Sequence, residues 1–186
     1  MEISPYFAEL NKILDKVDHN QINNFMDVLY KAYENGKMVF VIGNGGSYAN
    51  AEHFAQDLAK GTLMSMEQTN RIKAMSFSNA SFMTAQANDE GYDTVFTQPL
   101  ISFANEGDLL VIISGSGNSP NVVKALEYAN AHGIESVSVT GFSGGKINEI
   151  STHQMHVPCG DMCMVESVHS IIFHYIATEM KQKINS

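Results

Sequence analysis

Four titratable side chains occur in two pairs at helical spacing. His53 and Asp57 are four residues apart, so on a helix they share one face. Glu166 and His174 are eight residues apart and again lie close to one face. Imidazoles and carboxylates transfer protons and bind divalent metals. If two helices bring the pairs together, they predict an acid–base or metal site; taken singly, each side chain is better explained as solvated or structural.

Two turns rich in glycine and serine are candidates for binding an anion. The first, residues 43–47 (GNGGS), follows an apolar run and is neither a dinucleotide-binding fingerprint nor a P-loop. The second, residues 114–119 (SGSGNS), also follows an apolar run, and Ser119 is a good N-cap for a helix that begins at Pro120. Its three hydroxyls and free backbone N–H groups could hold one phosphate without Lys or Arg. A simple tight turn and a capping loop are the respective alternatives.

Strands and helices must alternate to position these residues. Apolar runs predict strands, strong at 38–42 and 109–113 and weaker at 72–77, 136–140 and 153–157. Helical periodicity predicts helices at 3–18, 20–35, 48–60, 80–105 with a break near Gly91, 120–132 and 162–184. This alternation indicates the α/β class with a doubly wound, flavodoxin-like sheet of five parallel strands. We expect a single domain over residues 1–186, in which residues 1–35 form an N-terminal helical extension.

Composition narrows the functional classes. Of the 186 residues 44% are apolar and 17% are charged, which is typical of a globular protein. The net charge of −9 argues against a nucleic-acid partner, because phosphate backbones require a basic surface. The spacing of Cys159 and Cys163 matches neither a redox motif nor a common zinc motif, so both are expected to be reduced thiols. The N-terminus lacks the features of a signal peptide, and no apolar run is long enough to span a bilayer. We therefore expect a cytoplasmic protein with no membrane partner.

Taken together, the motifs resemble the sugar isomerase (SIS) family. The resemblance rests on the two turns, 43–47 and 114–119, each at the end of a strand. The segments 53–57 (HFAQD) and 87–91 (ANDEG), and the pair of histidines at 169 and 174, resemble the phosphoheptose isomerase branch of that family. The likeness extends from about residue 36 to residue 180, and the N-terminal helices fit it too.

The resemblance implies roles for particular residues. It implies proton transfer by Asp57 and His174, with Glu166 assisting or replacing one of them, and it leaves His169 as a structural residue. It implies one zinc ion per subunit, held by His53, Asp57, Glu166 and His174. It implies that the phosphosugar contacts Asn44, Gly45, Gly46, Ser47, Asp57, Asn88, Asp89, Ser114, Gly115, Ser116, Ser119 and Glu166.

Four positions depart from the family pattern, and two of them concern the catalytic centre. Asp57 stands where the family has Glu, which withdraws the carboxylate by one methylene, and Glu166 stands where it has Gln, which adds a negative charge. Gly115 stands where the family usually has Thr, and no Arg follows near Gly61. The phosphate loop is therefore matched better than the catalytic centre. The extra carboxylate should favour a divalent cation.

The family likeness implies an aldose–ketose isomerase that converts sedoheptulose 7-phosphate to D-glycero-D-manno-heptose 7-phosphate, for heptose in surface polysaccharides such as lipopolysaccharide. It also implies a homotetramer with active sites at subunit contacts, and the apolar stripe on residues 7–33 is expected to pack against a partner chain. The alternative is a non-catalytic SIS protein. Such a protein would bind either a phosphosugar or, like the DnaA-associating type, a replication-initiator protein. Two retained histidines and two retained carboxylates favour the enzyme.

Overall fold

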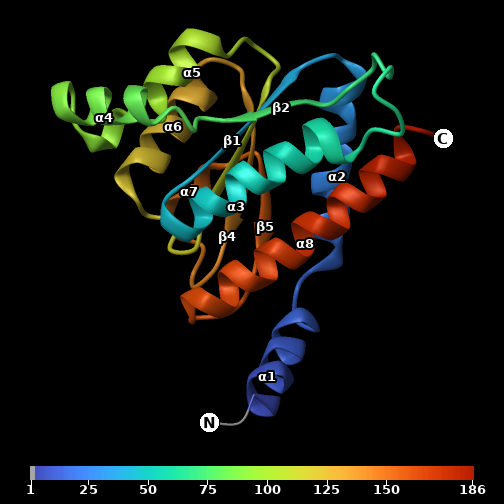
Figure 1. Cartoon of the computed structure of the whole chain (residues 1–186). Helices are drawn as coiled ribbons and strands as arrows, with labels where there is room; N and C mark the ends of the chain where they lie inside the picture. The colour runs from blue at the N-terminus through green and yellow to red at the C-terminus, as the bar shows by residue number, and fades with distance from the viewer. Residues whose placement is uncertain (1–2) are drawn as a thin grey trace.

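The protein is built around a five-stranded parallel sheet, as a computed structural model that describes residues 3–186 shows (Figure 1). The strand order is β2-β1-β3-β4-β5, which is the flavodoxin-like order predicted from the sequence. The strands are β1 (Met38–Gly43), β2 (Lys73–Ser76), β3 (Leu109–Ser114), β4 (Glu135–Thr140) and β5 (His153–His156). Residues 1 and 2, at the start of the expected extension, lie outside the described residues.

Alternating side chains of the central strands fill two separate hydrophobic cores. In β1, Val39 and Val41 point to one face of the sheet, whereas Phe40 and Ile42 point to the other. This alternation follows from the two-residue period of a strand, and both faces are apolar because helices cover both. The continuous apolar runs of β1 and β3 are therefore explained by burial on both sides.

The helices divide between the two faces. On one face lie α2 (His19–Glu34), α3 (Gly45–Gln56) and α8 (Met162–Lys183); on the other lie α5 (Thr97–Phe103), α6 (Pro120–Ala131) and α7 (Gly145–Ile150). The predicted helix at 80–105 is three pieces: α4 (Ala80–Asp89), the 3₁₀ turn η2 (Tyr92–Thr94) and α5. Gly91 has φ +98° between the first two pieces, so the break lies where it was predicted. The short helix α7 was not predicted.

The N-terminal extension behaves as two different elements. The helix α2 covers the sheet next to β5 and α8, and its residues Phe25 and Leu29 are fully buried. The part of the apolar stripe on residues 7–33 that belongs to α2 therefore packs on the sheet of its own chain. The helix α1 (Ser4–Leu14) extends away from the sheet (Figure 1), and Ile13 is its one fully buried residue. Leu10 and Leu14 are half-buried against the core, whereas Tyr6 and Phe7 remain exposed.

Within the described residues, no helix combines the length and the apolar character needed to cross a membrane.

Candidate functional site

The two glycine- and serine-rich turns lie next to each other at the carboxyl edge of the sheet. Strands β1 and β3 are hydrogen-bonded neighbours, and Gly43 pairs with Ile113 at their ends. The chain leaves β1 toward one face through α3, and it leaves β3 toward the other face through α6. This reversal of strand order is where doubly wound proteins bind ligands. A Cβ on Gly43 would lie 2.7 Å from the backbone of Ser47, so the turn is closed too tightly for any side chain there.

The second turn is held in shape by its own hydrogen bonds. The Gly117 N–H donates to the Ser114 hydroxyl (3.2 Å), and the Asn118 N–H donates to the Ser116 hydroxyl (3.4 Å). The Asn118 side chain also accepts from the Lys146 N–H (3.0 Å), which fastens the turn to α7. Ser119 occupies the N-cap position of α6, but its hydroxyl makes no capping bond. Pro120 has no N–H and the Val122 N–H donates to the Asn121 side chain, so in this turn the Asn121 backbone N–H and the Ser119 hydroxyl remain available to an anion.

Helix α8 begins against both turns. A Cβ on Gly115 would lie 2.5 Å from the Met162 sulfur, and a Cβ on Gly46 would lie 2.3 Å from a carboxylate oxygen of Glu166. The Asn50 side chain on α3 donates to the Glu166 backbone carbonyl (3.1 Å). The space next to Gly115, where the family usually has Thr, is thus filled by Met162, and the Glu166 carboxylate lies beside the first turn of α3.

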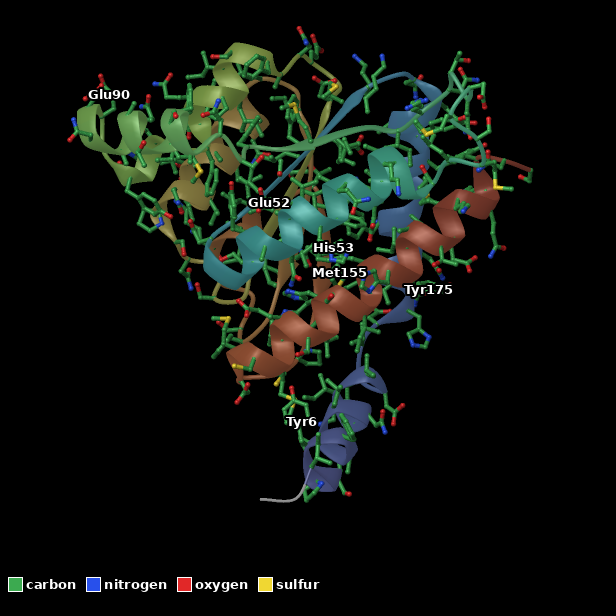
Figure 2. The ribbon with its side chains drawn as sticks, in the orientation of Figure 1. Tyr6, Glu52, His53, Glu90, Met155 and Tyr175 are labelled. Atoms are coloured by element: carbon green, nitrogen blue, oxygen red, sulfur yellow. The ribbon has the colours of Figure 1, made fainter. Side chains whose placement is uncertain are left out.

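Farther along the same two helices, three titratable side chains converge. The Asp57 carboxylate lies 3.5 Å from Nε2 of His53 and 3.7 Å from Nε2 of His174. The two imidazole rings are 4.9 Å apart, and one ligand atom from each of the three residues falls within 4.8 Å of the others. Figure 2 labels His53 between α3 and α8. Phe54 and Phe173, the neighbours of the two histidines, stack with ring centroids 4.4 Å apart and align the helices.

A π-helical turn, η1 (Asp57–Gly61), follows α3 and begins at this carboxylate. Such turns are rare and are frequent at functional sites. Both imidazoles are about half exposed, with side-chain exposures of 52% for His53 and 55% for His174, whereas Asp57 is 19% exposed. In the single chain, therefore, the two imidazoles of the group lie at the surface, and the Asp57 carboxylate beside them is largely covered.

The structure does not bring all the predicted residues to one point. Glu166 lies outside the group of three, since its carboxylate contacts Gly46 at the other end of the helix pair. Asn88 and Asp89 lie at the exposed end of α4, where the Asn88 amide bonds to the Asp89 carboxylate (2.8 Å). Within the described residues, neither forms a hydrogen bond to the two turns.

Two residues that were not predicted connect the turns. The Asn44 side chain exchanges two hydrogen bonds of 2.8 Å with the side chain of Asn121 on α6, and it accepts a third from the Tyr92 hydroxyl (2.9 Å). Asn121 follows Ser119-Pro120 directly, so its position beside the second turn could have singled it out. No sequence signal connects Tyr92 to Asn44, because the two residues are 48 positions apart.

The surroundings of His169 on α8 are those of a structural residue. Its ring is fully buried, its Nε2 atom lies 3.1 Å from the Thr140 carbonyl oxygen, and its Nδ1 atom has no partner among the described residues. Burial lowers the pKa of His169 to about 4. Burial also lowers the pKa of His156, which contacts the Thr140 hydroxyl. His169 is therefore a neutral side chain that ties α8 to β4.

The chain is similar to known proteins along most of its length. Residues 5–141 match the SIS domain. A probable phosphoheptose isomerase from Thermoplasma volcanium is 34% identical over 179 residues, which cover 96% of this chain and 90% of that protein. A phosphoheptose isomerase from Fusobacterium nucleatum is 33% identical, over 94% of this chain and 90% of that protein.

The fold is also that of a solved relative. The structure of a phosphoheptose isomerase from Neisseria gonorrhoeae superposes with a TM-score of 0.88 at 26% identity, and the match covers 97% of both chains. The similarity includes the N-terminal helices, since nearly the whole length of each chain is matched.

Proposed function

Because the chain belongs to the SIS domain family and, within it, to the phosphoheptose isomerases, we propose that it is an aldose–ketose isomerase that converts sedoheptulose 7-phosphate to D-glycero-D-manno-heptose 7-phosphate. The observation that carries the proposal is that α3 and α8 lie beside the two glycine- and serine-rich turns at one end and, farther along, bring His53, Asp57 and His174 together.

The phosphate is proposed to bind at the second turn. Ser114, Ser116 and Ser119 would supply hydroxyls, and the first turn of α6 would supply the backbone N–H of Asn121. Gly45, Gly46 and Ser47 begin α3 beside this turn and would contact the sugar. This distal phosphate provides binding energy remote from the reacting carbons.

The length of the helix pair supports a long substrate. His53 is eight residues beyond Gly45, the first residue of α3, which corresponds to roughly 12 Å along the helix axis. In an extended seven-carbon sugar phosphate the phosphate on C7 and the reacting C1 and C2 lie at opposite ends. The phosphate can then occupy the turn while C1 and C2 approach Asp57 and the two histidines. Asn88 and Asp89 remain proposed substrate contacts by resemblance.

The group of three fits a zinc ion. Ligand atoms around a tetrahedral zinc with bonds of about 2.1 Å are separated by about 3.4 Å. The observed separations of 3.5 Å and 3.7 Å between Asp57 and the two imidazoles are close to this value. Two histidines and one carboxylate are a ligand set of catalytic zinc sites, which keep a fourth position open. Zinc held there would polarise the sugar carbonyl as a Lewis acid.

Proton transfer is assigned to the same end of the helix pair. Asp57 would remove a proton from C1 while His174 protonates the carbonyl oxygen on C2, which gives an enediol. Asp57 would then return its proton to C2, and the hydroxyl on C1 would give its proton to His174 as the aldehyde forms. Zinc bound to Asp57 and His174 would compete with proton transfer by the same side chains. The dependence of turnover on zinc therefore distinguishes metal binding from proton transfer.

A homotetramer is proposed because α1 carries an uncovered apolar face. Ile3 beside the helix and Tyr6 and Phe7 within it are exposed, as are Ile171 and Tyr175 on the neighbouring α8. Figure 2 labels Tyr6 and Tyr175. An isolated helix of 11 residues is marginal in water without packing. Partner chains would cover this face and the half-exposed histidines.

Turnover of sedoheptulose 7-phosphate by the purified protein tests the function. We expect formation of the aldose 7-phosphate, with the rate measured as isolated, after chelation and after zinc is restored. Loss on chelation with recovery on zinc addition assigns the carbonyl chemistry to the metal, whereas unchanged turnover assigns it to Asp57 and His174. Binding of sedoheptulose 7-phosphate without turnover in any of the three states would identify a non-catalytic phosphosugar binder.

A further inference from the structure

A closed network of side-chain hydrogen bonds joins the first turns of α3 and α6. Asn44 is the N-cap residue of α3, and Asn121 is the second residue of α6. Each amide donates to the oxygen of the other at 2.8 Å, and the Tyr92 hydroxyl lies 2.9 Å from the Asn44 oxygen. The network therefore fixes the two proposed anion-binding helix ends relative to each other.

The orientation of both amides follows from one backbone group. The N–H of Val122 lies 3.0 Å from a side-chain atom of Asn121, and a backbone N–H can only donate. That atom must be the Asn121 oxygen, so the Asn44 atom that faces it must be the nitrogen. The Asn44 oxygen then faces the Asn121 nitrogen, and the Tyr92 hydroxyl must be the donor in its contact with Asn44.

Both amide oxygens are saturated as a result. The Asn44 oxygen accepts from Asn121 and Tyr92, and the Asn121 oxygen accepts from Asn44 and the Val122 N–H. A carbonyl oxygen has two lone pairs, so neither can accept a further bond. Asn121 is 1% exposed, whereas Asn44 is half-buried and keeps one N–H outside the network. Asn44 can therefore reach a ligand only as a donor.

We propose that Tyr92 and Asn121 are positioning residues that present the Asn44 amide to the phosphosugar exclusively as a hydrogen-bond donor. A donor selects acceptor atoms, of which the oxygens of an ionised phosphate are the strongest, and it disfavours groups that must themselves donate. The Tyr92 hydroxyl is the specificity-determining atom, because without it one lone pair of the Asn44 oxygen becomes free. This inference rests on the proposed phosphosugar function of the same site.

The variant Tyr92→Phe removes only that hydroxyl. The Asn44 amide keeps its orientation but loses one of the contacts that hold it in place, so we expect the KM for sedoheptulose 7-phosphate and the inhibition constant of inorganic phosphate to rise together, by up to about fivefold, with kcat changed by less than about twofold. The matched control is Tyr128→Phe on α6, because the Tyr128 hydroxyl makes no hydrogen bond within the described part of the chain. This control should leave all three constants unchanged.

A second variant separates positioning from stability. Asn121→Asp places an oxygen opposite the Asn44 oxygen, so one of the two hydrogen bonds of the pair is replaced by a repulsive contact in either orientation of the Asn44 amide. Phosphate inhibition should weaken by more than in Tyr92→Phe, with thermal unfolding recorded for every variant. A Tyr92→Phe protein with a lower unfolding temperature but unchanged phosphate inhibition and KM would overturn the inference. Phosphate binding that responds to both variants, in a protein without isomerase turnover, would instead refute the proposed function alone.

Discussion

Glu166 differs from the other titratable residues of the site in its surroundings. Its carboxylate contacts Gly46 at the start of α3, whereas His53, Asp57 and His174 face one another farther along the helices. The negative charge that replaces the family's Gln thus lies beside the proposed phosphate position. A carboxylate there repels a phosphate more than it assists a distant cation.

The variant Glu166→Gln tests this placement. Removal of the charge should tighten binding of sedoheptulose 7-phosphate by about fivefold, equivalent to about 1 kcal/mol, and should leave zinc affinity unchanged within about twofold. Titration calorimetry of both ligands measures the two effects. Glu34→Gln, an exposed carboxylate at the end of α2, makes the same charge change elsewhere and serves as the control. A large loss of zinc affinity in Glu166→Gln would show that Glu166 turns to become a metal ligand.

At the scale of elements, α8 does most to assemble the site. Met162 and Glu166 reach the two turns, His169 bonds to β4, and His174 completes the group of three. The N-terminal end of this helix thus lies at the proposed anion site, and its middle lies at the proposed zinc site. Contacts that hold α8 on the sheet therefore also hold the site together.

The buried imidazole of His169 makes this attachment sensitive to pH. Its pKa is about 4 in the folded protein and about 6.5 in the unfolded chain, so between these values only the unfolded state binds the proton. Stability should therefore fall as the pH drops from about 6.5 toward 4, by about 3 kcal/mol in total from this residue. Urea unfolding at pH 7.5 and 4.5 measures the loss.

The variant His169→Gln is the comparison for that measurement. Gln can still donate to the Thr140 carbonyl, but it does not titrate, so this variant should lose about 2–3 kcal/mol less than the native protein between the two pH values. His156, whose pKa is lowered for the same reason, contributes equally to both proteins. Equal losses of stability would contradict the assignment to His169.

Sequence periodicity predicted the elements better than their contacts. The strands and the break at Gly91 were predictable because apolar runs and glycine act locally. Helix α7 was missed because its six residues are too few to display a period. The pairing of Asp57 with His174 was expected only by resemblance. The contacts of Glu166 with Gly46 and of Tyr92 with Asn44 depend on packing between distant segments, which no local pattern encodes.

At the scale of the whole molecule, two surfaces of the single chain expose side chains that a partner chain could cover. Tyr6 and Phe7 on the apolar face of α1 are exposed, and the imidazoles of His53 and His174 are half exposed. Enzymes that form reactive enediols exclude water from the reacting carbons. A partner chain that covers both surfaces would satisfy the packing of α1 and the chemistry at once.

Sedimentation at micromolar concentration tests the assembly. We expect a tetramer for the native protein and smaller species for Phe7→Asp, since a charge on the apolar face of α1 opposes its burial. The control Asn11→Asp alters an exposed polar position of the same helix and should remain tetrameric. Turnover should fall with dissociation in Phe7→Asp. A native protein that sediments as a monomer would contradict the proposed assembly.

The parallel course of α3 and α8 has a consequence for protein engineering. Because each helical turn advances by about 5.4 Å, the separation between the phosphate turn and the histidine pair can be altered only in steps of one turn. The three-residue group could be moved one turn toward Gly45 by placing the two histidines and the carboxylate one turn earlier on both helices. This change would shorten the distance between the group and the phosphate turn and leave that turn unaltered. The shorter distance would fit a sugar phosphate with fewer carbons. The preference for substrate chain length could therefore be redesigned one helical turn at a time.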